Sequence, residues 1–146
     1  MSDKELLEWA AKAAGMWRGA FEIEDDSDQP VFDPVKGFRL AYGRGWWNPL
    51  TDDGDALRLA VKLRLSIQPV GGAVYAAPPR SVVRSLGLGI ISAEFMGDDE
   101  LNPKDEEGQR YLRYLREDYP EKIVSAAAAT RRAITRAAAE IGKAMA

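Results

Sequence analysis

The side chains that could carry out chemistry in this chain are limited, because the sequence contains no histidine and no cysteine. Histidine is the commonest general base at neutral pH, and the usual zinc sites need histidine or cysteine. Serine–histidine and cysteine–histidine nucleophiles are therefore excluded. Carboxylate–magnesium chemistry, lysine or tyrosine bases and carboxylate pairs remain. We therefore expect a binding protein and not an enzyme, with no catalytic residues, no cofactor and no metal.

The densest group of carboxylates is formed by Asp52, Asp53 and Asp55. Their spacing does not match a calcium-binding loop, which needs further oxygen ligands and a distal glutamate. They directly precede an apolar stretch, where aspartate caps a helix and acidic side chains favour its positive end. The pattern therefore favours helix capping over metal binding.

Two longer acidic runs extend from Glu22 to Asp33 and from Asp98 to Glu107. Such runs can imitate the phosphates of nucleic acid, or they can simply keep loops hydrated. A magnesium-dependent nuclease would need carboxylates that converge on one point, and neither run has such a pattern. From the second run we select Asp98, Asp99 and Glu100 as candidate partner-binding residues.

Arginine and tyrosine alternate between residues 110 and 116. Both residue types are enriched in protein interfaces, and the combination also suits single-stranded nucleic acid. The alternative is a solvated helix face with Glu106 and Glu107 as partners. Arg110, Arg113 and Tyr114 are the candidate partner-binding residues here.

Trp46 and Trp47 are adjacent in a segment that reads as extended. Neighbouring side chains of an extended segment point to opposite sides, so one can be buried while the other is free. We expect Trp47 in the core. The sequence leaves Trp46 open between a buried position and an exposed anchor for a partner, a role in which tryptophan is enriched.

Three helices are expected to position these residues. Ser2 and Glu5 form a capping box for the first, which should reach about Arg18 before Gly19. The second follows Asp52–Asp55 and is so apolar that we expect it to be largely buried. The third extends from about Glu121 to Met145, where its alanines allow close approach of a neighbouring element. On its wet face Arg136 and Glu140 are expected to pair.

Short strands are expected between these helices. They cover 21–24, 38–42, 66–70, 73–76 and 90–95. Gly71-Gly72 indicates a hairpin, and Pro69 indicates that its first strand is either an edge strand or a short one. Ser81–Leu86 is left open between strand and helix. The sequence therefore predicts a single-domain α/β (α+β) sandwich, in which helices pack on a small, mainly antiparallel sheet.

Length and composition fit one domain. The chain has 146 residues, of which 46% are hydrophobic and 29% charged. No repeat or domain boundary is evident, so residues 1–146 are expected to form one unit. A net charge of −3 makes nucleic acid an unexpected direct ligand. No window approaches the apolar length of a membrane span, and the acidic N-terminus is unlike a signal peptide, so we expect a cytoplasmic protein without membrane contact.

Three segments, 6–15, 47–63 and 129–145, resemble small uncharacterised proteins of tailed bacteriophages and prophages of the alpha-beta-alpha sandwich type. The resemblance implies a phage or prophage origin and a sandwich-like fold. It implies no activity and no catalytic residues. Residues of about 66–120 fall outside it and read as a variable insertion.

These observations lead us to expect a phage accessory protein. It would bind and inhibit or redirect a host protein, such as a CRISPR-type defence complex, in the bacterial cytoplasm, and a homodimer is left open. The first alternative is a small-molecule-binding protein that sequesters a nucleotide defence signal. A carboxylate–magnesium nuclease is the further alternative.

Overall fold

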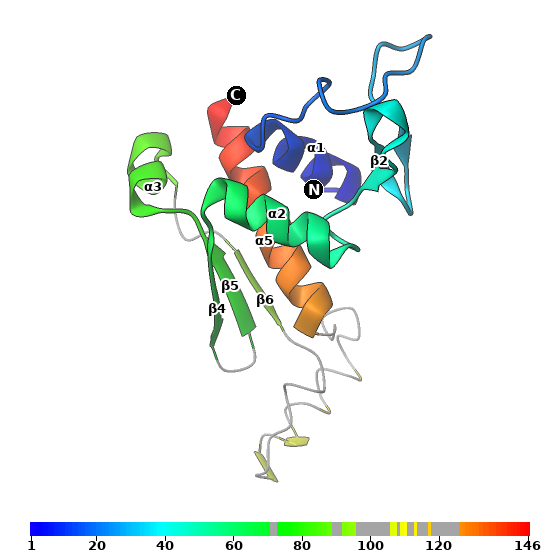
Figure 1. Ribbon diagram of the computed structural model, residues 1–146. Helices are drawn as coiled ribbons and strands as arrows, with labels where there is room; N and C mark the ends of the chain where they lie inside the picture. Colours follow the sequence, from blue (N-terminus) through cyan, green and yellow to red (C-terminus); the bar gives the residue numbers. More distant parts are fainter. Residues whose placement is uncertain are drawn as a thin grey trace.

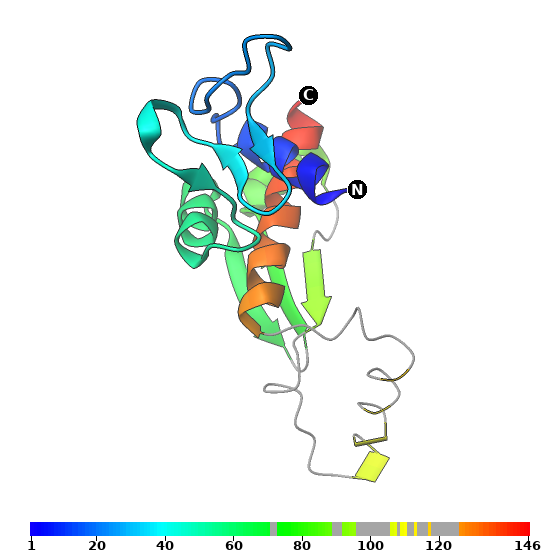
Figure 2. The same cartoon turned by 90° about the vertical axis from the view of Figure 1, so that its right-hand side faces the viewer.

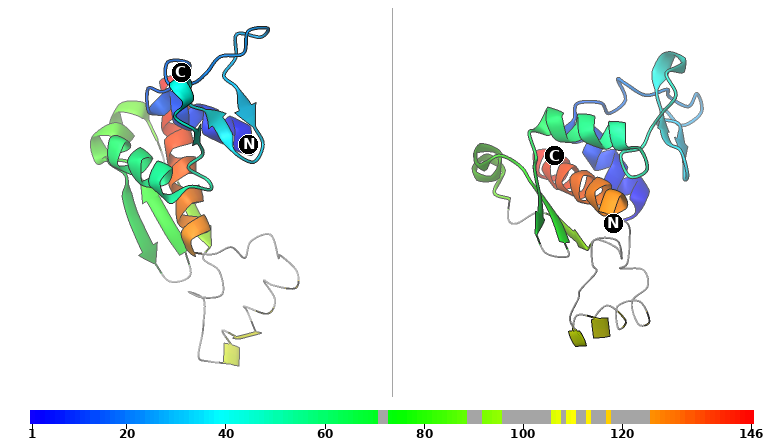
Figure 3. Two further views of the ribbon diagram at one scale, coloured as in Figure 1. Left: turned by 45° about the vertical axis from the view of Figure 1, so that its right-hand side comes forward. Right: turned by 60° about the horizontal axis from the view of Figure 1, so that its bottom comes forward.

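A computed structural model describes residues 1–70, 73–88, 92–95, 106, 107, 109, 110, 113, 117 and 126–146. Helix α5 (Ala126–Met145) lies between two layers (Figures 1 and 3). Helices α1 (Asp3–Ala13) and α2 (Asp53–Leu63) pack on one side of it, and a sheet packs on the other. The predicted α+β class is therefore confirmed.

Helix α1 begins with the predicted capping box. The Ser2 hydroxyl accepts a hydrogen bond from the Glu5 amide at 3.2 Å, and the Ser2 amide donates to the Glu5 carboxylate at 2.8 Å. The helix ends at Ala13, so the predicted end near Arg18 is wrong. Gly15, with φ +70°, turns the chain out of the helix, which allows Trp17 to pack edge-on against aromatic rings of the core.

Small residues allow α1 and α5 to approach closely, as the alanine pattern predicts. Ala10 on α1 and Ala138 on α5 are fully buried. A Cβ atom on Gly142 would overlap the carbonyl oxygen of Trp9. On the opposite side of α5, Ala133 and neighbouring alanines pack against the sheet described next. Residues 121–125, which were also expected in this helix, lie outside the described part of the chain.

The sheet under α5 contains β4 (Ser66–Val70), β5 (Ala73–Ala77) and β6 (Ser92–Phe95), all antiparallel and in that order. Strands β4 and β5 form the predicted hairpin, although Gly71-Gly72 itself is outside the described residues. Among the described strands β4 pairs with β5 alone, so Pro69 lies in an edge strand, which is one of the two predicted possibilities. Arg80–Leu86 form helix α3, which resolves the open alternative for Ser81–Leu86.

A second three-stranded antiparallel sheet packs beside α1 (Figure 2). It contains β1 (Phe32–Asp33), β2 (Gly37–Arg39) and β3 (Trp46–Trp47). The expectation of one sheet is therefore wrong. The predicted strand at 21–24 consists only of the isolated bridges Phe21–Leu40 and Ile23–Pro30. The predicted strand 38–42 stops at Arg39, because Ala41–Gly43 form the 3-10 helix η1.

Helix α2 is less buried than its composition predicts. Leu57 and Val61 are 63% and 68% exposed, whereas Leu59 and Ala60 are buried against the core. The reason is that α2 covers α5 with one face only, and the chain places further aliphatic residues on its outer face. The expectation of a largely buried helix is therefore wrong for that outer face.

Candidate functional site

The β2–β3 hairpin carries one face into the core and presents the other to solvent. Phe38 lies opposite Trp47, and Arg39 lies opposite Trp46. Because directly opposite residues share a side of the sheet, the first pair faces inward and the second faces outward. We call the outward residues Lys36, Arg39, Tyr42, Arg44 and Trp46 the hairpin surface.

The inner face of the hairpin is held by aromatic packing. The Phe38 ring lies 5.4 Å from Trp17, 5.1 Å from Phe21 and 5.0 Å from Phe32, measured between centroids. Trp47 lies 5.7 Å from Phe21. Such pairs contribute about 0.5–1.5 kcal/mol each beyond the burial of their area. Trp47 is buried, which confirms its predicted place in the core.

Trp46 is half-buried on the outer face, and two cations lie close to its ring. The Lys36 ammonium lies 5.4 Å and the Arg39 guanidinium 5.9 Å from the centroid of its ring. Cations at such distances are attracted to the face of an aromatic ring. Arg39 also forms an ion pair with Glu22 at 3.2 Å. The Trp46 ring is thus partly solvated, and most of the charged side chains near it are positive.

Tyr42 stands at the tip of the hairpin and is 92% exposed. Its backbone is left-handed, with φ 62° and ψ 31°, and Gly43 and Gly45 also have positive φ. A left-handed conformation costs roughly 1–2 kcal/mol for a residue with a Cβ atom. The Arg44 guanidinium lies 5.9 Å from the Tyr42 ring. The chain therefore holds a large aromatic side chain in water, on a strained backbone, without burying it.

The base of the hairpin is tied to α2. The buried Asn48 amide donates to the Asp55 carboxylate at 2.9 Å, and the Asn48 side chain donates to the carbonyl of Val35 at 3.2 Å. Gly37, with φ +90°, lies so close to the Trp47 carbonyl that a Cβ atom would overlap it. These contacts hold the hairpin surface in one orientation relative to the helices.

Asp52 caps α2 as predicted, because it accepts a hydrogen bond from the Asp55 amide at 2.8 Å. Asp53 and Asp55 lie in the first turn of the helix, where Asp55 accepts from Arg58 at 2.8 Å and Asp53 pairs with Arg131 at 2.7 Å. Among the residues that the structure describes, no three acidic side chains gather as metal ligands would.

The first acidic run is partly engaged in local contacts. Asp28 pairs with Arg18 at 3.7 Å. The backbone amides of Lys36 and Val35 donate to Asp33, which lowers the pKa of its carboxyl below the ordinary value.

On α5, Arg136 pairs with Glu94 of β6, so the expected Arg136–Glu140 pair is wrong. Arg136 therefore pairs with a carboxylate on the sheet and not with Glu140, one turn further along its own helix.

The structure separates the candidate residues predicted from the sequence. Trp46 lies on the hairpin, in the cyan part of Figure 1. Arg110 and Arg113 are exposed and have helical backbone. The other candidates, Asp98, Asp99, Glu100 and Tyr114, lie outside the described residues.

Sequence reasoning missed most of the hairpin surface. Tyr42 was assigned to a strand because it continues the alternation of Phe38 and Leu40. The signal that could have found it is Gly43-Arg44-Gly45, since glycines at such spacing indicate a turn with positive φ. A tyrosine at the edge of that turn is then a candidate for an exposed position.

Comparison of the chain with protein-family models, curated proteins and solved structures finds no match. The resemblance to phage proteins therefore stays a prediction. Within the described residues, no helix has both the length and the apolar character needed to cross a membrane.

Proposed function

We propose that this chain is a non-catalytic protein-binding module that engages a partner protein through the hairpin surface. The observation that carries the proposal is Tyr42, which is 92% exposed on a left-handed backbone. Strained backbone positions concentrate at functional sites, because elsewhere nothing favours their retention. An ordinary solvated turn has no need of a bulky aromatic residue in this conformation.

The composition of the hairpin surface supports a protein partner. Tyrosine, tryptophan and arginine dominate binding hot spots, and Tyr42, Trp46 and Arg44 supply one of each. The tip projects into solvent, whereas sites for small molecules are concave. The hairpin geometry therefore favours a protein partner over a nucleotide signal, which remains the first alternative function.

Charge indicates which kind of partner surface would fit. Lys36 and Arg44 have no ion-pair partner within the described residues, whereas Arg39 forms an ion pair with Glu22. The chain as a whole carries a net charge of −3. A local positive surface on an acidic protein suits an acidic patch on a partner, where complementary potentials raise the association rate.

We further propose that the partner is a host protein in the bacterial cytoplasm and that the chain is a phage accessory protein, with a CRISPR-type defence complex as a candidate target. The support is the resemblance of segments 6–15, 47–63 and 129–145 to phage proteins, together with a sequence that lacks histidine and cysteine. Arg110 and Arg113, which are both exposed, are candidates for a second contact with the same partner.

Affinity capture from a phage-sensitive bacterium tests this proposal. The full chain is compared with a Tyr42→Asn/Arg44→Ser variant and with Leu57→Ser, which alters an exposed apolar residue on α2. We expect one host protein to be retained by the wild type and by Leu57→Ser, and to be lost with the hairpin variant. Equal retention by all three forms, or retention of none, would contradict the proposal. A thermal shift with cyclic dinucleotides but no retained protein would favour the alternative.

A further inference from the structure

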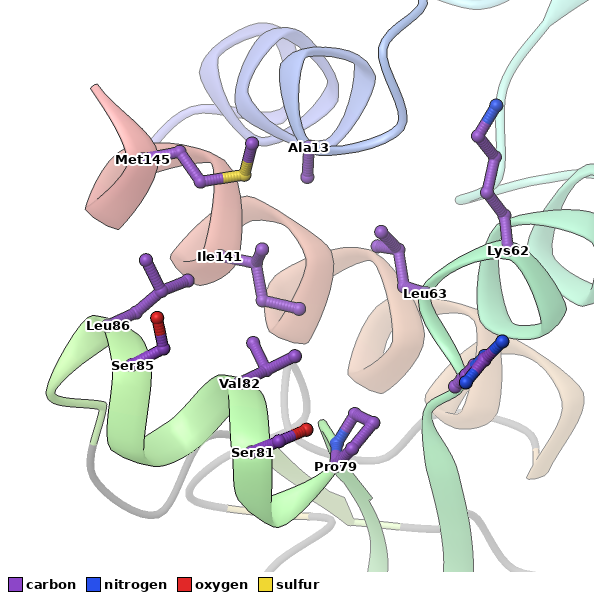
Figure 4. A pocket seen from close by; sticks show the side chains of 11 residues that line it. Ala13, Lys62, Leu63, Pro79, Ser81, Val82, Ser85, Leu86, Ile141 and Met145 are labelled. Carbon is purple, nitrogen blue, oxygen red and sulfur yellow. The ribbon is translucent and has the colours of Figure 1, made fainter.

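A groove lies away from the hairpin, where the carboxyl-terminal ends of α1, α2 and α5 meet α3 (Figure 4). Its volume is about 650 Å³. Sites for small ligands commonly enclose roughly 300–1,000 Å³, so the groove has the size of a ligand site.

The walls of the groove are aliphatic. Leu63 from α2, Val82 and Leu86 from α3, and Ile141 and Met145 from α5 point toward a shared space in Figure 4. Among the described residues that line the groove, none is aromatic. Flat ring ligands are usually held by aromatic stacking, whereas a flexible chain needs only aliphatic contact. Methionine is also well suited to adapt its shape to such a chain.

The polar side chains of the groove are cations and hydroxyls. Lys62, Arg64, Ser81 and Ser85 line it, and no carboxylate of the described part of the chain does. Within the described part of the chain, neither Lys62 nor Arg64 has an ion-pair partner. By contrast Arg131 and Arg136 on α5 are both paired with carboxylates. In Figure 4 the Lys62 side chain extends away from the apolar walls, so its ammonium does not face them. In a chain with more acidic than basic residues, the unpaired Arg64 beside an apolar groove forms a site complementary to an anion.

Arg64 also has an unusual backbone. It is the C-cap of α2, with φ 55° and ψ 41°. Glycine commonly closes a helix in this left-handed conformation, because it lacks the steric penalty of a Cβ atom. Lys62, in the last turn, already complements the negative end of the helix dipole. The strained position therefore carries a second cation that the helix itself does not require.

We propose that this groove binds a free single-chain aliphatic carboxylate. The chain would lie against Val82, Leu86 and Ile141, and the carboxylate would lie beside Arg64. This site is separate from the hairpin surface and does not depend on the proposed protein partner.

Isothermal titration of the full chain with dodecanoate, below its micelle concentration, tests the proposal. We expect saturable binding, and weaker binding of dodecyltrimethylammonium, which has the same chain and the opposite charge. Arg64→Gly should weaken dodecanoate binding by about threefold to fivefold, the value of a partly exposed ion pair. This variant removes the cation and suits the left-handed backbone, so it keeps the fold intact.

The matched control is Arg84→Ala, which removes an exposed cation from α3 outside the groove lining and should leave the affinity unchanged. Val82→Asp should abolish binding, and circular dichroism checks that it folds. No saturable binding, or equal affinity of Arg64→Gly and the wild type, would overturn the proposal. A wild-type dimer that Val82→Asp dissociates, seen by analytical ultracentrifugation, would also overturn it, because a second copy would then cover the groove.

Discussion

The backbone amide of Asn48 donates a hydrogen bond to the buried carboxylate of Asp55, with 2.9 Å between Asn48 N and Asp55 Oδ2. This contact joins the end of β3 to the first turn of α2. The other carboxylate oxygen of Asp55 accepts from Arg58. One buried acid thus links the hairpin that carries Tyr42 and Trp46 to the helical layers.

The first prediction concerns this link. Asp55→Ala should lower the free energy of unfolding by about 2–3 kcal/mol, because it leaves the buried Asn48 amide without an acceptor. Asp53→Ala is the matched control, since Asp53 is exposed and its pair with Arg131 should contribute at most about 1 kcal/mol. Urea unfolding followed by tryptophan fluorescence measures both. Equal losses in the two variants would contradict the assigned role of Asp55.

The second prediction concerns the contact between α1 and α5. Gly142→Ala should destabilise the protein by about 1–3 kcal/mol or more, because the added methyl group would overlap the Trp9 carbonyl and force the helices apart. Gly19→Ala is the control, because no atom lies within 4 Å of its added Cβ and its φ is not positive. The melting temperatures of both variants, compared with that of the wild type, measure the two effects. A neutral Gly142→Ala would show that the helices are farther apart than described.

The elements that could be predicted are those with a local physical cause. Ser2 and Glu5 form a cap within one turn, Asp52 caps α2, and Pro69 marks a sheet edge, since each acts on its immediate backbone. The end of α1 could not be predicted, because Trp17 fits the helical spacing but gains more by packing on Phe38.

The hairpin surface was harder to predict, because its formation depends on contacts between distant segments. The alternation of apolar and other side chains around Phe38 predicts a strand, but it does not show whether the strand continues to Tyr42 or ends in a turn at Ala41. Only the pairing of Arg39 with Trp46 brings Lys36 and Trp46 together and leaves Tyr42 at the tip. The division into two sheets likewise follows from tertiary packing, because one sheet packs on α5 and the other lies beside α1, and no local pattern encodes this arrangement.

The third prediction separates stability from binding at the tip. Asparagine tolerates the left-handed region better than tyrosine, so Tyr42→Asn should raise the free energy of unfolding by up to about 1 kcal/mol. The exposed ring buries almost no area, so little is lost on its removal. Partner capture should nevertheless fall. Urea unfolding and capture from lysate are measured on the same preparation, and a loss of stability in this variant would contradict the strain assigned to Tyr42.

The fourth prediction concerns pH. Hydrogen bonds from the Ser2 amide and hydroxyl to Glu5 lower the pKa of its carboxyl below the ordinary value of 4.5. A lowered pKa in the folded state means that the contribution of Glu5 to stability is present above pH 4.5 and is lost as the pH falls through the folded pKa. An NMR titration of the Glu5 side chain should show the lowered pKa in the wild type. Ser2→Ala should move it toward 4.5, and an unchanged titration would contradict the capping contact.

The proposed binding of a partner protein at the hairpin surface can be tested by site-specific photocrosslinking in a phage-sensitive bacterium. A photoreactive phenylalanine analogue is placed at position 42 in one form of the protein and at position 57, also exposed but on α2, in another. We expect a discrete adduct with one host protein from position 42 and none from position 57. No adduct from position 42, or the same adducts from both positions, would contradict it.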